Sequence, residues 1–358
     1  MQPPRSIAFA CYSPKIFSQT DKMIVWIFSS PRSGSTWLGK IFDSHPGVFY
    51  LHEPDIADRG LDLIPYWSSG AEGEDDLDRA RKYIARLLSA RTLRATGSRP
   101  YFRKEYRSPL QELIRRALIC GSKAYTILNS EHSAGSIPDM TQAPPELTVI
   151  KTVSALGRVR VLLEAQTNII PILLIRHPIE YVYSRMRGIA GGHMEPQPTL
   201  EQLEITATAK RIKIPRAALL GGTTDERLAW EWLIANSEAY DAIISKGGIV
   251  LSYNALNANP HSGARALFSK LGLAFPRQTE NFLQSHADDG RYYSVVRKPS
   301  AVSAWMTAMD SAEISRIQEI ISLGMVGQMF LPLERTISEE SIHLGMGELA
   351  WATSAAIS

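Results

Sequence analysis

The sequence has few cysteines and no long apolar run. Its two cysteines, Cys11 and Cys120, form neither a metal-binding spacing nor a disulfide framework. We therefore expect both to be small apolar residues of a protein in a reducing, cytoplasmic compartment. No segment reaches the roughly 18 consecutive apolar residues of a transmembrane helix. Residues 1–22 also lack the apolar run of a secretory signal and are interpreted as an N-terminal extension.

The sequence also lacks an excess of charge of either sign. It contains 39 Lys and Arg against 36 Asp and Glu, which gives a formal net charge of +3. A nucleic-acid-binding protein carries a basic surface that dominates this sum, so we expect no nucleic-acid partner. A local anion site is still compatible with the sequence, because clustered charges decide anion binding more than the total does.

What the sequence does contain is an alternation of apolar strands and amphipathic helices. Apolar runs typical of buried parallel strands occur at 23–28, 48–51, 147–150, 169–175 and 249–251. Helical spacing of apolar residues follows at 36–44, around 159–164, from 179, and at 228–244 and 265–271. This alternation predicts an α/β, P-loop-like three-layer fold, with a central mostly parallel sheet covered by helices on both faces.

We assign this fold to residues 23–335 and interpret residues 336–358 as a C-terminal tail. Two stretches fit the alternation poorly, about 55–145 and 188–224, and we expect them to be insertions at the loop edge of the sheet. The first contains the basic and aromatic run 99–107. A solvated face is the simplest interpretation of this run, and a clamp for an anionic ligand or a lid is the alternative.

The strand at 23–28 leads into a loop that suits an anion. The first N–H groups of the following helix lack intrahelical partners, and the helix dipole favours negative charge there. The loop adds a permanent cation, hydroxyl donors and a glycine that permits close backbone approach: Arg32, Ser33, Gly34, Ser35 and Thr36. These residues predict phosphate binding, with a capped turn and a surface arginine as the alternative.

A metal-dependent nucleoside triphosphatase is disfavoured. A Walker A loop needs G-x-x-x-x-G-K-[ST], and here Ser29 stands at the first glycine and Ser35 at the lysine. The strand at 169–175 ends in Arg176, where a magnesium-binding aspartate would be expected. We therefore expect no metal.

Four segments resemble motifs of the sulfotransferases that use 3'-phosphoadenosine 5'-phosphosulfate (PAPS). Residues 30–38 are similar to the loop that binds the 5'-phosphosulfate, P-[KR]-[ST]-G-[ST]-T-x-L. Arg176 and Pro178, with Ser184 eight residues after the arginine, are similar to the 3'-phosphate motif. Two later segments match more weakly: Tyr253-Asn254-Ala255-Leu256 with Pro260 and Leu267-Phe268, and Arg297-Lys298 with Trp305. The matches occur in the family's order over residues 23–305, and the carbohydrate-type and bacterial members are the most similar.

The resemblance implies PAPS as the donor, adenosine 3',5'-bisphosphate (PAP) as the product, and no metal. The residues implied to bind the donor are Arg32, Ser33, Gly34, Ser35, Thr36, Trp37, Arg176, Ser184, Tyr253, Arg297 and Lys298. Trp37 and Tyr253 would stack on the adenine, with a place in the core as the alternative. Arg32 would stabilise the charge that builds on the oxygen leaving with PAP.

The acceptor hydroxyl needs a base, because a neutral hydroxyl is a weak nucleophile. Cytosolic family members use the histidine of K-T-H, but the corresponding segment here is Lys151-Thr152-Val153. Residues 50–54 are similar to the F-Y-L-x-E-P segment of carbohydrate sulfotransferases, which implies Glu53 as the base. His52 is the alternative base, and Glu53 would then be a structural partner of a nearby cation. Lys151 is a further residue implied to contact the donor or the sulfuryl group.

The resemblance therefore implies sulfuryl transfer from PAPS, by in-line displacement, to a hydroxyl of a sugar, a glycolipid or a polar small molecule. Two alternatives stay open. One is a divergent P-loop nucleotide kinase or phosphotransferase. The other is a non-catalytic family member that binds PAP or PAPS.

Overall fold

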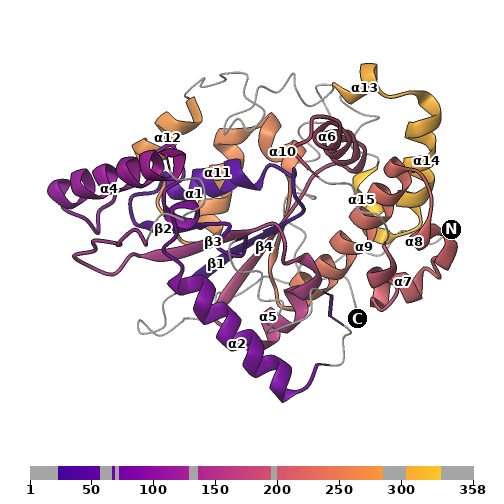
Figure 1. Ribbon diagram of the computed structural model, residues 1–358, viewed down its shortest axis with the longest axis horizontal. Coiled ribbons are helices and arrows are strands. Elements are labelled where there is room, and N and C mark those ends of the chain that lie inside the picture. The colour runs from indigo at the N-terminus through magenta and orange to yellow at the C-terminus, as the bar shows by residue number, and fades with distance from the viewer. Residues whose placement is uncertain are drawn as a thin grey trace, which may run out of the picture.

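The computed structural model describes residues 23–56, 67–68, 72–128, 136–194, 200–284 and 304–331. Within these residues, a five-stranded parallel sheet forms the centre of the molecule (Figure 1), with the strand order β2-β3-β1-β4-β5. The strands are β1 (Ile24–Ser29), β2 (Val48–His52), β3 (Leu147–Thr152), β4 (Ile169–Ile175) and β5 (Ile249–Ser252). The predicted α/β class and parallel sheet are confirmed.

The continuous apolar runs follow from burial of both faces of the sheet. In β1, Trp26 and Phe28 belong to the core on one face, and Val25 and Ile27 belong to the core on the other. All four side chains are completely buried. Strands of this kind cannot alternate apolar with polar residues, because neither side of the sheet meets water.

Helices cover both faces of this sheet, as the sequence predicts. One core packs against α2 (Glu74–Ser89), α5 (Val159–Ala165), α6 (Pro178–Ala190), α9 (Thr224–Ser245), α14 (Ser311–Ser322) and α15 (Met325–Phe330). The other packs against α1 (Ser35–Asp43), α10 (Tyr253–Ala258), α11 (Pro260–Lys270) and α12 (Arg277–Gln284). Figure 1 shows α2, α5 and α9 below the sheet and α1 and α11 above it.

The remaining helical elements lie mostly in the two predicted insertions. The first insertion contributes α3 (Leu93–Thr96) and α4 (Pro109–Leu128), besides α2. The second contributes η2 (Glu201–Leu203), α7 (Ala207–Arg211) and α8 (Arg216–Leu220), and its helices α7 and α8 pack on α9. A short η1 (Leu156–Arg158) precedes α5, and α13 (Trp305–Ala308) precedes α14. Among the described helices, none has both the length and the apolar character needed to cross a membrane.

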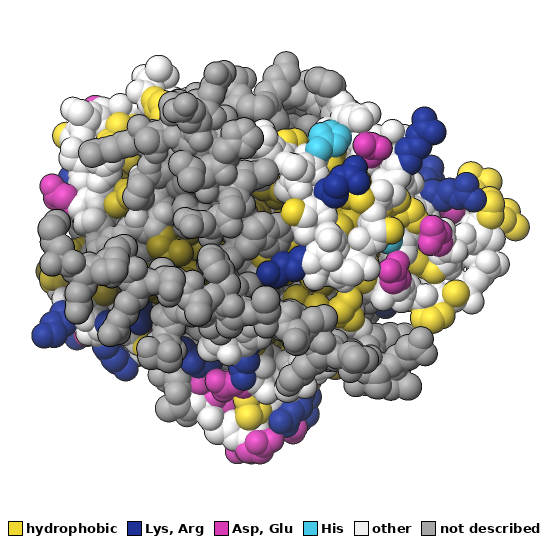
Figure 2. Space-filling view, turned by 180° about the vertical axis from the view of Figure 1, so that it is seen from behind, with side chains coloured by type: hydrophobic (Ala, Val, Ile, Leu, Met, Phe, Trp, Pro, Cys, Tyr) yellow, Lys and Arg dark blue, Asp and Glu magenta, His cyan; other side chains and the backbone are white. Residues whose placement is uncertain are grey.

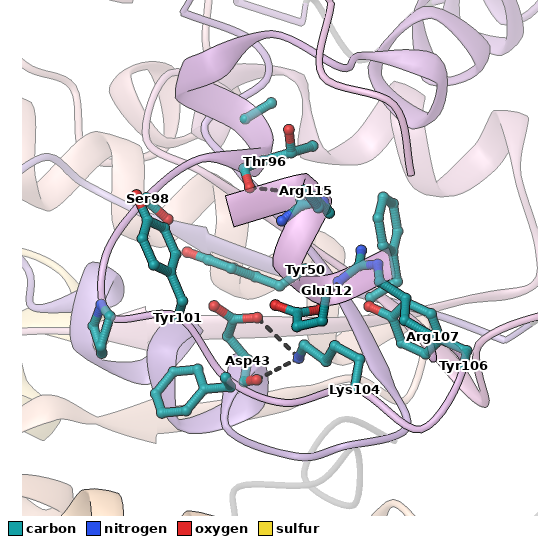
Figure 3. A pocket seen from close by; sticks show the side chains of 14 residues that line it. Asp43, Tyr50, Thr96, Ser98, Tyr101, Lys104, Tyr106, Arg107, Glu112 and Arg115 are labelled. Atoms are coloured by element: carbon teal, nitrogen blue, oxygen red, sulfur yellow. Dashed lines mark hydrogen bonds and ion pairs between the residues drawn. The ribbon is translucent and has the colours of Figure 1, made fainter. Parts of the chain in front are cut away.

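The basic run 99–107 fastens the first insertion to the sheet. Lys104 Nζ donates to the carbonyl of Val48 at 2.8 Å and pairs with Asp43 at 3.0 Å. Arg107 Nε donates to the carbonyl of Asp139 at 2.7 Å. Both cations are buried, so the interpretation of the run as a solvated face is wrong for them. Figure 3 shows Lys104 and Asp43 in the small polar cavity, of about 30 Å³, that the run closes against β2 and α4.

The strand order also decides where the site can form. The chain leaves β1 toward β2 on one side and later places β4 and β5 on the other side of β1. Ligands of open parallel sheets bind outside the carboxyl ends of the strands, at such a point of reversal. Arg32, Glu53, Lys151, Arg176 and Tyr253 all lie at or just beyond these carboxyl ends.

Candidate active site

The loop after β1 is shaped for close approach to a ligand. Gly34 is the N-cap of α1 and has a φ of +84°, in the left-handed region that favours glycine. A Cβ atom at this position would lie 2.2 Å from Cε2 of Tyr253, so the aromatic ring also requires a glycine here. No side chain caps the N-terminus of α1. Its first N–H groups are therefore directed at a site that suits an anion.

The two segments predicted to bind phosphates meet in the structure. Arg32 Nε donates to Ser184 Oγ at 3.2 Å, although the two residues are 152 positions apart. Arg176 Nη1 donates to the backbone carbonyl of Arg32 at 2.9 Å. The loop after β1 and the start of α6 therefore form one cationic, donor-rich surface, as the resemblance implies.

Arg176 is held in place by Glu180, which sequence reasoning missed, and by Tyr253 and Asn254 of the third resembling segment. Its Nε pairs with Glu180 Oε2 at 3.0 Å, and its guanidinium lies 5.3 Å from the centre of the Tyr253 ring. Asn254 donates to Glu180 at 3.0 Å and accepts from the backbone N–H of His177 at 3.1 Å. The spacing of Glu180 four residues after Arg176 is a helical ion-pair spacing that could have indicated this contact.

These contacts leave part of the Arg176 guanidinium available. The contacts to Glu180 and to the Arg32 carbonyl use Nε and Nη1. Nη2 forms no hydrogen bond with any residue in the described part of the chain. A guanidinium with one nitrogen left over suits an additional anionic ligand.

Trp37 and Tyr253, predicted to stack on adenine, lie against each other. Their ring centroids are 6.2 Å apart in an edge-to-face arrangement. Both side chains are buried and belong to the core that α1 and α10 share. The place in the core that the sequence left open for Trp37 is therefore observed. Stacking on adenine stays a prediction for both residues.

Lys151 connects the phosphate loop to Glu53. Its ammonium forms an ion pair with Glu53 Oε1, and Thr36 Oγ1 lies 3.4 Å from Nζ. The backbone N–H of Glu53 donates to the carbonyl of Lys151 at 2.8 Å, which continues the pairing of β2 with β3. Lys151 is only 1% exposed and Glu53 only 8%, so this is a buried pair. The three residues predicted separately from the sequence are thus one contiguous group.

Glu53 has a second cationic partner, Arg94 in α3. The guanidinium of Arg94 pairs with Glu53 Oε2, while about half of the Arg94 side chain is exposed to solvent. Sequence reasoning missed Arg94, and no local signal could have found it. The residue reaches the site only because the first insertion folds back over β2.

The two cations decide the ionisation of Glu53. Burial alone would raise the pKa of this carboxyl, but the charge of Lys151 and hydrogen bonds from Lys151 and Arg94 lower it to about 2. Burial lowers the pKa of Lys151, against the attraction of Glu53. Both pKa values are lowered, which favours the charged form of Glu53 and disfavours that of Lys151, because Glu53 has two cationic partners and Lys151 is more deeply buried. At neutral pH we take the pair to be ionised, since two cations contact the carboxylate.

His52 lies beside Glu53 and is neutral at physiological pH. Its Nδ1 is 2.9 Å from the hydroxyl of Tyr50, and its Nε2 is 3.9 Å from Glu53 Oε2. Burial lowers the pKa of His52 to about 3, and the charge of Lys151 acts in the same direction. A neutral imidazole can accept a proton, so the structure keeps both predicted bases at the site.

The backbone is unusual at two of the predicted catalytic residues. Arg32 has a φ of 69° and Glu53 a φ of 46°, in the left-handed region that non-glycine residues rarely adopt. Among the described residues, only Met140 and Lys213 share this feature without being glycines. Such conformations cost about 1–3 kcal/mol each and cluster at functional sites.

Two predicted donor-binding residues, Arg297 and Lys298, lie outside the described residues, as do residues 1–22 and 336–358. In the described part of the chain, no group of three or more His, Cys, Asp and Glu side chains could hold a metal ion.

Comparison with known proteins identifies the family. Residues 25–277 match the model of the sulfotransferase family, which is most of the chain, and the chain therefore belongs to this family. The resemblance inferred from the four motifs is confirmed. No curated protein matches the sequence.

Several solved structures are similar to this chain. The sulfotransferase domain from the curacin biosynthetic pathway is 17% identical, with a TM-score of 0.40 over 84% of this chain and 98% of that one. The sulfotransferase domain from the Synechococcus PCC 7002 olefin synthase is 17% identical, with a TM-score of 0.38 over 84% and 96%. Mouse sulfotransferase SULT7A1, complexed with PAP, is 11% identical, with a TM-score of 0.37 over 86% and 88%.

Proposed function

We propose that this sulfotransferase transfers the sulfuryl group of PAPS to a hydroxyl of a sugar, a glycolipid or a polar small molecule. The observation that carries the proposal is the junction of the two phosphate-binding segments. Arg32 contacts Ser184, and Arg176 contacts the Arg32 carbonyl, next to the uncapped N-terminus of α1. PAPS carries a phosphosulfate at one end and a phosphate at the other, and this surface offers donors and cations to both.

We assign the phosphosulfate to the first loop. The N–H groups at the start of α1, the Thr36 hydroxyl and the Arg32 guanidinium would bind it. We assign the 3'-phosphate to Nη2 of Arg176 and to Ser184. The Ser184 hydroxyl accepts from Arg32 and still has a proton to donate to a phosphate oxygen. The resemblance adds Trp37 and Tyr253 for the adenine and Arg297 and Lys298 for the remaining phosphate contacts.

Arg32 and Lys151 are the cations that would favour the transition state. During transfer, the acceptor oxygen forms a bond to sulfur while the bond from sulfur to the bridging phosphate oxygen breaks. Negative charge builds on that bridging oxygen and leaves with PAP. Cations fixed beforehand at this position stabilise the transition state more than the ground state. Lys151 is placed for this role because its ammonium lies between Thr36 and Glu53.

Glu53 is the proposed base and takes the proton of the acceptor hydroxyl. With a pKa of about 2 it is ionised, but it is a weak base while both cations hold it. The anionic phosphosulfate would compete with Glu53 for the ammonium of Lys151. Loss of that partner would raise the pKa of Glu53, so its basicity would increase once the donor is bound. His52 is the alternative base, because it is neutral and lies beside the same carboxylate.

Radiolabelled PAPS, offered with pooled glycans and polar metabolites, tests the proposal. The wild-type protein should label an acceptor, and Glu53→Gln should reduce turnover by roughly 10²–10⁴-fold. PAP affinity, measured by calorimetry, should stay close to that of the wild type and shows that the variant is folded. If Glu53→Gln keeps full turnover while His52→Gln loses it, the base is His52.

Two other results would overturn the proposal. Magnesium-dependent turnover of ATP that is lost in Thr36→Ala would indicate a nucleotide kinase or phosphotransferase. Tight binding of PAP without transfer to any acceptor would indicate a non-catalytic member of the family.

A further inference from the structure

The helix α4 presents a broad apolar face to solvent. Every exposed position from Leu110 to Leu128, apart from Thr126, carries an apolar side chain, a glycine or a cysteine. Leu113 is 66% exposed and Ile127 82% exposed. Figure 1 shows α4 at one end of the molecule, and Figure 2 shows hydrophobic side chains at the corresponding end from behind.

The opposite face of α4 is attached to the molecule mainly by polar contacts. Its buried residues are Glu112, Arg115 and Ile119. Arg115 donates to the carbonyl of Thr96 in α3 at 2.7 Å, and Glu112 pairs with Arg107 at 3.2 Å. The helix therefore uses little of its apolar surface to pack on the fold. Most of this surface faces outward.

The width of the apolar face indicates what covers it. With 3.6 residues per turn, the exposed apolar positions extend over about half of the helix circumference. A pair of helices in a coiled coil uses a narrower stripe, in which two of every seven positions are apolar. A face that covers half the helix instead suits a flat, continuous apolar medium.

The charged side chains of α4 that border this face are both positive. The one carboxylate of α4, Glu112, is buried and paired with Arg107 and Arg116. Arg116 and Lys123 lie along one margin of the apolar face, and each has a long apolar stem with a cationic end. Apolar residues bordered by Lys and Arg, without carboxylates, are the pattern of helices that lie in the interface of a membrane with anionic lipids.

We propose that α4 docks the protein on the surface of an anionic lipid bilayer. The helix lies parallel to the membrane, with its leucine and isoleucine side chains among the acyl chains and Arg116 and Lys123 at the headgroups. It does not cross the bilayer, which agrees with the absence of a membrane-spanning helix among the described residues. The proposal goes beyond sulfuryl transfer and does not depend on it.

Flotation with lipid vesicles tests the docking. At low ionic strength, the full-length protein should float with vesicles of phosphatidylcholine and phosphatidylglycerol, and less with phosphatidylcholine alone. The double variant Leu113→Glu and Leu118→Glu should lower the partition coefficient at least about tenfold, because two leucines that insert into the bilayer are lost. Leu323→Glu is the matched control, since it changes a leucine that is 54% exposed at the end of α14. The control should bind as the wild type does.

A fluorescent label on Cys120 gives a second measurement that leaves the leucine and isoleucine side chains of the apolar face unchanged. Cys120 is exposed on α4, and in a Cys11→Ser background it is the one thiol in the sequence. An environment-sensitive label there should shift its emission to the blue when anionic vesicles are added.

Three results would overturn the proposal. The wild-type protein could stay in the aqueous fraction with anionic vesicles, or the label on Cys120 could show no shift. Light scattering could also show a dimer that the double leucine variant converts to a monomer, which would make α4 an interface between two copies of this chain.

Discussion

The buried pair of Glu53 and Lys151 predicts an asymmetric effect on stability. Glu53 has two cationic partners, Lys151 and Arg94, whereas Lys151 has Glu53 as its one ion-pair partner among the described residues. Replacing either member by a neutral side chain breaks the same contact. The two replacements nevertheless leave different groups behind, and the group that remains determines how far the free energy of unfolding falls.

Glu53→Gln should lower the free energy of unfolding more than Lys151→Met does. It leaves the ammonium of Lys151, which is 1% exposed, without its ion-pair partner. Breaking a buried pair in this way costs about 3–5 kcal/mol. Lys151→Met leaves the carboxylate of Glu53 beside Arg94, so the cost should be nearer that of a lost buried hydrogen bond, about 1–3 kcal/mol. Arg94→Gln should cost below about 1 kcal/mol, because half of that side chain is in water.

Urea unfolding at pH 7, followed by circular dichroism, measures these free energies. The double variant of Glu53→Gln and Lys151→Met completes a cycle that isolates the coupling between the two residues. It should be more stable than Glu53→Gln alone, because the one charge left unpaired, Arg94, is half exposed to solvent and no buried charge is left unpaired. If Lys151→Met is as costly as Glu53→Gln, Arg94 does not support the carboxylate and the reasoning is wrong.

Three further predictions concern the loop, the second phosphate segment and acid stability. Gly34→Ala should lower the thermal unfolding temperature and weaken PAP binding in calorimetry, because a Cβ at φ +84° would collide with Tyr253. Arg176→Ala should weaken PAP binding at least about tenfold in the same measurement. Arg176→Lys should restore it only in part, because one ammonium cannot keep the contacts to Glu180 and the Arg32 carbonyl and also reach the phosphate. The pKa of Glu53 is lowered from 4.5 to about 2, so the ionised group stabilises the fold fully above pH 4.5 and this stabilisation is lost as the pH falls toward 2. The unfolding free energies of wild type and Glu53→Gln should therefore converge over that range in acid titrations.

The fold could be predicted because its strands are encoded locally. Burial on both faces makes each strand a continuous apolar run, and β1 and β4 follow this rule almost residue by residue. The predicted end of β3 was less accurate, since the strand continues past Ile150 through Lys151 and Thr152. These polar residues remain in the strand because distant partners satisfy them. Glu53 pairs with Lys151, and Trp26 Nε1 donates to Thr152 at 3.0 Å.

The geometry of the loop proposed to bind phosphate could be predicted for a related reason. A strand, a loop with glycine and hydroxyl side chains, and a helix N-terminus are adjacent in the sequence at residues 24–43. The contact between Arg32 and Ser184 could not be derived in this way, since it depends on β1 and β4 being neighbours in the sheet. The family resemblance implied that both residues bind one ligand, and the sheet order supplies the physical reason.

No local sequence pattern contains the basicity of the proposed base, Glu53. The identity of Glu53 follows from a short motif, but its basicity depends on Lys151 and Arg94, which lie 98 and 41 positions away. A carboxylate held by two cations is fixed in position and poorly basic, so Glu53 is a weak base while no donor is bound. In the proposed mechanism, an anionic donor that draws Lys151 toward itself would reverse this balance at the position where the acceptor proton is taken. The same lysine would then stabilise the departing charge, and binding of the donor and activation of the base would be one event rather than two.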